Sequence, residues 1–221
     1  MNKIKFKPYL LALAPFLLLI LLFELLPLCS IIFKSFMEEG SGGFTFDNYI
    51  NVFSKPIYRQ AIINSITISI ISAAVGIVVA FIGAKAAHNT ESLMKRVFMS
   101  ILNMTSNFAG VPLAFSFIIL LGKTGVLVIL AKALGIESMA TFDIYSNNGL
   151  ILIYIYFQIP LATLLLIPAF NALREEYREA AKILRANSFQ YWIHVGLPIL
   201  MPSLLSTFSV LFANSLVAYG T

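Results

Sequence analysis

The chain has 221 residues, of which 59% are hydrophobic and only 11% are charged, and its mean hydropathy is +0.90. A soluble domain has about half apolar and about a quarter charged residues, so this composition excludes a soluble protein and indicates an integral membrane protein. The single cysteine, Cys29, excludes an internal disulfide and a cysteine-based metal cluster, and no metal site is predicted.

The formal net charge of +5 is distributed in a topological pattern. Basic residues cluster in the N-terminal tail, in the segment 85–96 and in the segment 174–185, which are alternate loops and therefore lie on one side of a membrane. The positive-inside rule places these loops and the N-terminus in the cytoplasm. The charge therefore follows membrane topology, and we predict no nucleic-acid binding.

Five apolar stretches are long enough to cross a hydrocarbon core of about 30 Å. They predict an all-α, polytopic helical bundle in a single membrane domain, residues 1–221. The predicted spans cover about 9–33, 61–84, 97–121, 149–170 and 198–219. A cytoplasmic loop over 171–197 separates the last two spans.

The first stretch is longer than the apolar core of a signal peptide, which runs about 7–15 residues, so it is read as a retained anchor. Glu24 lies inside this stretch, where the free energy of placing a carboxylate in the membrane is unfavourable. It is therefore a candidate for the transport pathway. Packing against a polar group of a neighbouring helix, protonation, or contact with a water-filled crevice would explain Glu24 equally well.

The second span has small residues at helical spacing, which predicts a face for close helix packing: Ser69, Ser72, Gly76, Ala80 and Gly83. The piece 125–136, after the third span, is too short to cross and is predicted to be an external or re-entrant helix.

Polar residues within the later spans must face protein or water, because lipid cannot satisfy them. They are candidates for lining a translocation pathway, with hydrogen bonding between helices as the alternative. The set is Asn103, Thr105, Ser106, Asn107, Gln158 and Asn214.

The loop between the last two spans is predicted to form two short helices. Charged residues cover one side of the first helix, and apolar residues recur at i, i+4, i+7 and i+11 on the other. Asn187 with Gln190 three residues later has the pattern of a capping box that restarts a helix. Gly196 and Pro198 are expected to close the second helix before the last span begins.

The sequence Glu179-Ala180-Ala181, with Val195-Gly196-Leu197-Pro198 later in the loop, resembles the EAA loop of binding-protein-dependent ABC transporter permeases, and the spacing from Glu179 to Pro198 matches the family pattern without a gap. That pattern is E-A-A, three residues, G, nine residues, I, one residue, L-P. Arg185 stands where the family has glycine, so we expect either a more helical turn or a strained one. The segment Phe44–Ser65 is also similar to the family, in which such a short helix leads into the next span.

The resemblance implies the permease subunit of an ATP-driven importer in the plasma membrane of a prokaryote. The chain itself would be no enzyme and hold no cofactor, since ATP would bind a cytosolic ABC ATPase dimer. Its other partners would be membrane lipid, a second permease subunit in a homo- or heterodimer, and an extracytoplasmic substrate-binding protein. The family usually has one further span, so the chain is expected to be about one helix short. The ATPase-coupling residues would be Glu179, Ala180, Ala181, Arg185, Phe189, Trp192, Leu197 and Pro198.

The ending FANSLVAYGT and the short external loops resemble the family branch that moves polyamines, ferric iron, thiamine or organophosphonates. The alternative function is an ion-coupled secondary transporter. Such transporters commonly need several ionisable groups within the membrane and internal repeats. Glu24 is the only ionisable residue of that kind in the predicted spans, and no repeat is visible.

Overall fold

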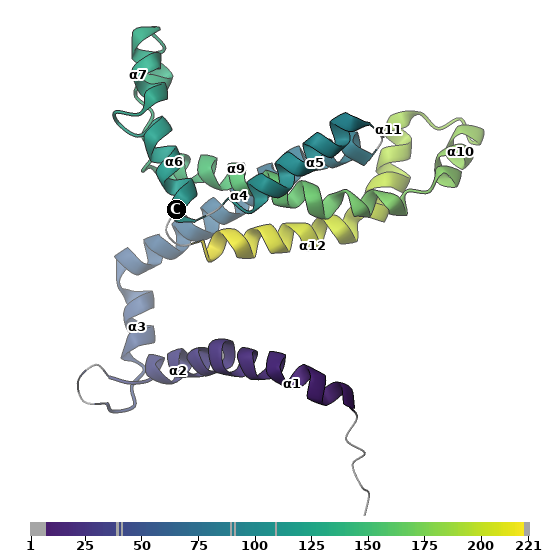
Figure 1. Cartoon of the computed structure of the whole chain (residues 1–221). Coiled ribbons are helices and arrows are strands. Elements are labelled where there is room, and N and C mark those ends of the chain that lie inside the picture. Colours follow the sequence, from purple (N-terminus) through teal and green to yellow (C-terminus); the bar gives the residue numbers. More distant parts are fainter. Residues whose placement is uncertain are drawn as a thin grey trace, which may run out of the picture. The chain divides into compact units, whose positions relative to one another are not determined.

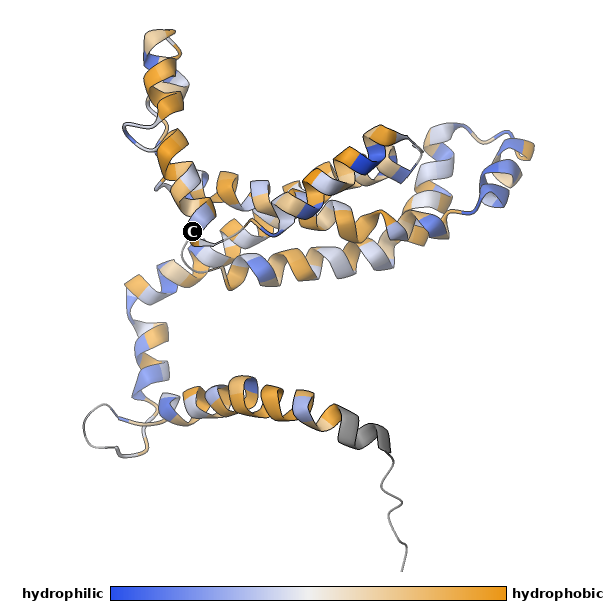
Figure 2. Ribbon diagram, viewed as in Figure 1, coloured by the Kyte–Doolittle hydropathy of each residue, from blue (hydrophilic) through white to orange (hydrophobic). Residues whose placement is uncertain are grey.

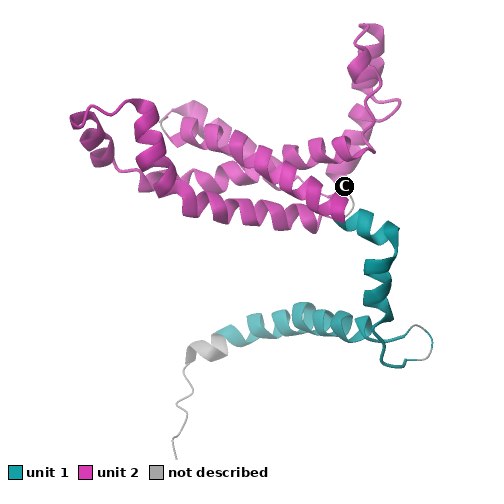
Figure 3. Ribbon diagram, turned by 180° about the vertical axis from the view of Figure 1, so that it is seen from behind, with its two compact units in different colours: residues 1–62 teal, residues 63–221 magenta. Residues whose placement is uncertain are grey.

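The computed structural model describes residues 8–218, apart from residues 39, 41, 89, 91 and 109. The chain divides into two compact units, residues 1–62 and 63–221 (Figure 3). Five helical segments within the described residues are long and apolar enough to cross a membrane. The prediction of an all-α, polytopic membrane bundle is confirmed.

Unit 1 begins with one helical segment in three parts, α1 (Pro8–Ile20), the π-turn η1 (Leu21–Leu25) and α2 (Leu26–Ser35). The π-turn immediately precedes Leu26-Pro27. Proline lacks an N–H and its ring clashes with the carbonyl four residues earlier, and a π-turn is a common way for a helix to pass such a point. Here Leu26 N–H bonds the carbonyl of Leu21, five residues back.

The next helices after α2 are α3 (Asp47–Ser54) and α4 (Pro56–His88), and aromatic residues lie on either side of the α2–α3 connection. Their side chains form an aromatic cluster with ring centroids 5.2–5.7 Å apart. Ser35 Oγ and Tyr49 OH share a hydrogen bond of 2.8 Å, and Asn48 donates to two carbonyls of the turn. The short helix expected before the second span is therefore present, and that span starts five residues earlier than predicted.

The core of unit 2 forms where the small face of α4 packs against α9 (Asn147–Leu166) and α12 (Leu197–Leu216). Ala73, Ala80 and Ala84 of α4 are fully buried there, together with Ala162 of α9 and Leu211 of α12. A Cβ added at Gly76 would come within 3.4 Å of Gln158, so the backbones approach closely. The packing face predicted for the second span is confirmed.

The third predicted span, 97–121, is wrong as a single helix. The structure has α5 (Leu93–Ser106), a break, and then α6 (Val111–Leu121), α7 (Val126–Ala133) and α8 (Glu137–Ala140). Gly110 has φ = +70°, a conformation that favours glycine and ends helical geometry. The apolar segment long enough to cross a membrane is instead Val111–Ala133. It includes α7, a short separate helix within the piece 125–136 that was predicted to be external or re-entrant.

Candidate coupling loop

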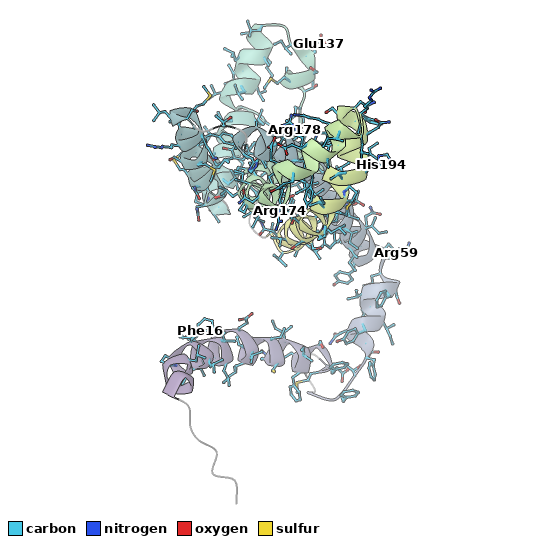
Figure 4. The ribbon with its side chains drawn as sticks, turned by 90° about the vertical axis from the view of Figure 1, so that its right-hand side faces the viewer. Phe16, Arg59, Glu137, Arg174, Arg178 and His194 are labelled. Carbon is cyan, nitrogen blue, oxygen red and sulfur yellow. The ribbon has the colours of Figure 1, made fainter. Side chains whose placement is uncertain are left out.

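The loop after α9 lies at one end of unit 2, and α6 and α7 lie at the other end (Figure 1). It starts with the 3₁₀ turn η2 (Pro168–Ala172) and continues into α10 (Glu175–Ile183), which stands out as hydrophilic from the apolar spans (Figure 2). Arg174 and Arg178 project from this segment, and His194 from the helix that follows (Figure 4). The polar loop between the last two apolar spans is therefore folded into helices.

The predicted apolar face of α10 is only partly used within the chain. Ala181 is buried against the loop, whereas Tyr177 and Leu184 are 39% and 81% exposed. Ile183, which is outside the predicted face, is 82% exposed. A groove of about 540 Å³ runs between α10 and the next helix, and Ala180 and Ala181 form part of its wall. Glu179 is exposed at the same helix. The end of α10 thus presents apolar surface that its own fold does not cover.

Arg185 takes the left-handed conformation, with φ = +52°. Its N–H donates to the carbonyl of Lys182 at 2.9 Å, and Ala186 N–H donates to that of Ala181 at 2.9 Å. These two bonds define a Schellman motif, which usually places glycine at this position. Of the two alternatives expected for Arg185, the structure shows the strained one, with the turn geometry kept.

Replacing Arg185 with glycine is therefore expected to stabilise this turn by about 0.5–1 kcal/mol, because the left-handed penalty exceeds the added freedom of the unfolded chain. Hydrogen exchange of the amides in residues 181–190 should slow accordingly. Arg185→Ala is the control, since it removes the charge but keeps the Cβ. Equal protection in both variants would show that the backbone strain is not the cause.

The second loop helix, α11 (Ser188–Tyr191), starts with the predicted capping box. Asn187 Oδ1 accepts from Gln190 N–H at 2.8 Å, and Gln190 Oε1 accepts from Asn187 N–H at 2.9 Å. The prediction that Gly196 and Pro198 close this helix is wrong. The chain passes through the π-turn η3 (Trp192–Gly196) directly into α12.

The resulting continuous helix, Ser188–Leu216, has 29 residues and is about 43 Å long at 1.5 Å per residue. The π-turn again precedes a Leu-Pro pair, Leu197-Pro198, and Leu197 N–H bonds the carbonyl of Trp192. As in the first span, the turn lets a helix pass a proline. A displacement at α11 is consequently transmitted along the axis of α12.

Trp192 lies against the bundle. Its ring is 5.7 Å from that of Phe81, and Lys85 Nζ lies 4.3 Å from its centroid, a distance typical of a cation–π contact. A Cβ on Gly196 would lie 2.6 Å from Trp192 Cε3, so the ring also covers this glycine. Phe189, by contrast, is 72% exposed. Phe189 and Trp192 thus have different surroundings.

Gly196→Ala is expected to displace the Trp192 ring from its position over residue 196 and to destabilise the loop by about 1–3 kcal/mol. Trp192 is the chain's only tryptophan, so a red-shifted fluorescence maximum would report the displacement. Gly83→Ala is a matched control, because its added Cβ would have no neighbour nearer than 3.6 Å. An unchanged spectrum in Gly196→Ala would contradict the packing described above.

Gln158, a predicted pathway residue, is fully buried where α4, α9 and α12 meet. Its Nε2 donates to Ser72 Oγ at 3.2 Å and to Ser215 Oγ, and the two serines lie 3.4 Å apart. Gln158 Oε1 and Ser69 Oγ have no hydrogen-bond partner among the described residues. The sequence indicated Gln158, Ser69 and Ser72 separately, but their contact with one another and with Ser215 depends on the packing of three helices. We call this set the polar cluster.

Within the described part of unit 2, none of the other predicted pathway residues hydrogen-bonds Gln158. The side chains of Asn103, Thr105, Ser106 and Asn107 all bond carbonyls of their own helix three or four residues back, at 2.8–3.1 Å. Asn214 is half-buried on α12, and Glu24 is exposed on the π-turn of the first span. No group of three metal-ligating side chains occurs in the described part of the chain.

No family model matches the chain. It is 28% identical, over 85% of its length, to the spermidine/putrescine transport system permease protein PotB of Haemophilus influenzae. It is 29% identical, over 76% of its length, to the trehalose transport system permease protein SugB of Mycobacterium tuberculosis. The chain spans 67% of the first relative and 55% of the second.

The fold is that of a solved bacterial ABC transporter involved in the import of the acidic polysaccharide alginate. The TM-score is 0.71 at 16% identity, over 94% of this chain and 73% of that one. The five apolar helices and this architecture are those of a multi-pass membrane protein. In sequence the chain is similar to transport system permease proteins, and in fold it is similar to an ABC transporter.

Proposed function

We propose that the chain forms part of the solute pathway of an ATP-driven importer and couples to cytosolic ATPase subunits through the segment 174–198. The observation that supports this most strongly is the continuous helix from Ser188 to Leu216. A partner that moves α11 would tilt α12 as a rigid body, which is a direct way to switch access across the membrane. The similarity to transport permeases favours this function over an ion-coupled secondary transporter.

The contact with the ATPase is assigned to the exposed residues at the tip of the loop. Phe189, Ile183 and Leu184 are each at least 72% exposed and apolar, which is typical of side chains that insert into a groove on a partner. Glu179 supplies a charge for hydrogen bonds to that partner. Trp192 serves instead to hold α11 against α4, so its contribution to ATPase binding is indirect.

In the proposed topology the N-terminus and this loop face the cytoplasm, since basic residues are concentrated on that side. A substrate-binding protein would deliver solute to the opposite face, and a second permease subunit would complete the pathway. The polyamine and trehalose permeases are about equally similar. A polyamine, ferric iron, thiamine or an organophosphonate therefore stays a prediction for the substrate.

Co-purification in mild detergent tests the coupling. The tagged chain is co-expressed with each ABC ATPase of its source organism in turn, as wild type and as Glu179→Lys. Glu137→Lys, which reverses an exposed carboxylate on α8 at the other end of unit 2, is the control. One ATPase should be retained by wild type and control and lost by Glu179→Lys. Retention of no ATPase by the wild type would refute the function.

A further inference from the structure

A basic cavity of about 330 Å³ lies between the coupling loop and the end of α4. We define it by its five basic side chains: Lys85, His88, Arg174, Arg178 and Lys182. Three come from the loop and two from the last turns of α4, so the cavity exists only because the loop folds back on the bundle. It is separate from the exposed apolar tip.

The lining of the basic cavity has a large excess of positive charge. Four side chains are cationic at neutral pH, and Glu175 is the one carboxylate among the lining residues. In the described part of the chain, no carboxylate forms an ion pair with any of these four cations. Like charges gathered around one cavity repel each other and raise the local concentration of anions.

The basic cavity lies at the C-terminal end of the apolar helix α4 and has aromatic rings in its lining. Aromatic rings form its floor, with Phe170 5.8 Å from the ring of His88 and Trp192 beneath Lys85. Above Lys85, α4 is apolar over more than the length of a membrane crossing. Aromatic rings and cations at the end of an apolar span are typical of the level of lipid headgroups.

We propose that this basic cavity binds the phosphate of an anionic phospholipid. Two guanidinium groups, of Arg174 and Arg178, offer the paired N–H donors that match phosphate oxygens. Basic pockets beside membrane helices on the cytoplasmic side are suited to such headgroups, so the inference rests on the proposed orientation of the loop. A bound lipid would join α10 to α4 and fix the loop for coupling.

The lipid comparison uses the full chain alone, so that it can fail independently of ATPase binding, and two further measurements add inorganic phosphate or the ATPase. Native mass spectrometry would compare retained lipid after reconstitution with phosphatidylglycerol or phosphatidylcholine. The variants are Arg174→Gln/Arg178→Gln and the control Lys123→Gln/Lys132→Gln, whose two cations are exposed at the other end of unit 2. Wild type and control should prefer phosphatidylglycerol, and the arginine variant should lose about tenfold or more of that preference.

Three outcomes would overturn the proposal. One is equal retention of both lipids by the wild type, or a loss of the preference for phosphatidylglycerol in the lysine control that equals the loss in the arginine variant. Another is binding of inorganic phosphate without retention of lipid, which would assign the cavity to a soluble anion. The third is displacement of phosphatidylglycerol by the bound ATPase, which would assign the cations to an acidic side chain of that partner.

Discussion

The variant Phe189→Asp is expected to lose about 100-fold in affinity for the ATPase while staying folded and inserted. Phe189 is 72% exposed, so the substitution should change the stability of the chain by about 0.5 kcal/mol or less. A buried aromatic anchor at an interface contributes about 2–4 kcal/mol when truncated, and about 2.7 kcal/mol corresponds to 100-fold. A quantitative binding titration in detergent measures the change.

Tyr145→Asp is the matched control for Phe189→Asp. Tyr145 is 61% exposed and lies just before α9, whereas the loop follows α9, so about 30 Å of helix separates the two positions. The control should bind the ATPase as the wild type does. Unchanged affinity in Phe189→Asp would show that the exposed tip of the loop is not the contact surface.

Truncation of the polar cluster should have the largest effect on stability. Gln158→Ala removes two hydrogen bonds and leaves a cavity among three helices, with an expected loss of about 3 kcal/mol. For a chain of this size that corresponds to a fall of about 6–12 °C in the unfolding midpoint. Thermal unfolding in detergent, followed by circular dichroism, measures it.

Gln158→Leu separates the effect of volume from that of polarity. Leucine fills most of the same space and removes the unpartnered Oε1, and Ser72 and Ser215 remain close enough to bond each other. The loss should therefore stay below about 1.5 kcal/mol. If both variants unfolded at the same temperature, the hydrogen bonds rather than the packing would dominate, contrary to this account.

The sequence predicted those features that depend on local pattern. Apolar length predicted helical spans, small residues predicted the packing face of α4, and Asn187 with Gln190 predicted the start of α11. Each depends on residues within a few turns of one another, so spacing alone was sufficient. The family pattern also located the strained turn, because one position carries arginine where a left-handed backbone favours glycine.

The predictions failed where backbone geometry or tertiary packing determines the local structure. The helix predicted over 97–121 is broken near Gly110, since glycine reaches a positive φ that hydropathy does not reveal. The end predicted at Gly196 and Pro198 is absent because a π-turn lets the helix pass the proline. Trp192 was grouped with Phe189, yet Phe81 and Lys85, about 110 residues earlier, cover it. Contacts over that sequence distance cannot be seen in a local pattern.

Cysteine cross-linking is the most direct test of the coupling loop. Cys29 is the only cysteine, so Cys29→Ser gives a background in which one engineered thiol is unique. In that background, Phe189→Cys should cross-link to the ATPase subunit through a short bifunctional reagent, with a yield that changes when ATP is added. Glu137→Cys should give no cross-link. A cross-link from position 137 and none from position 189 would contradict the assignment of the 174–198 segment as the ATPase contact.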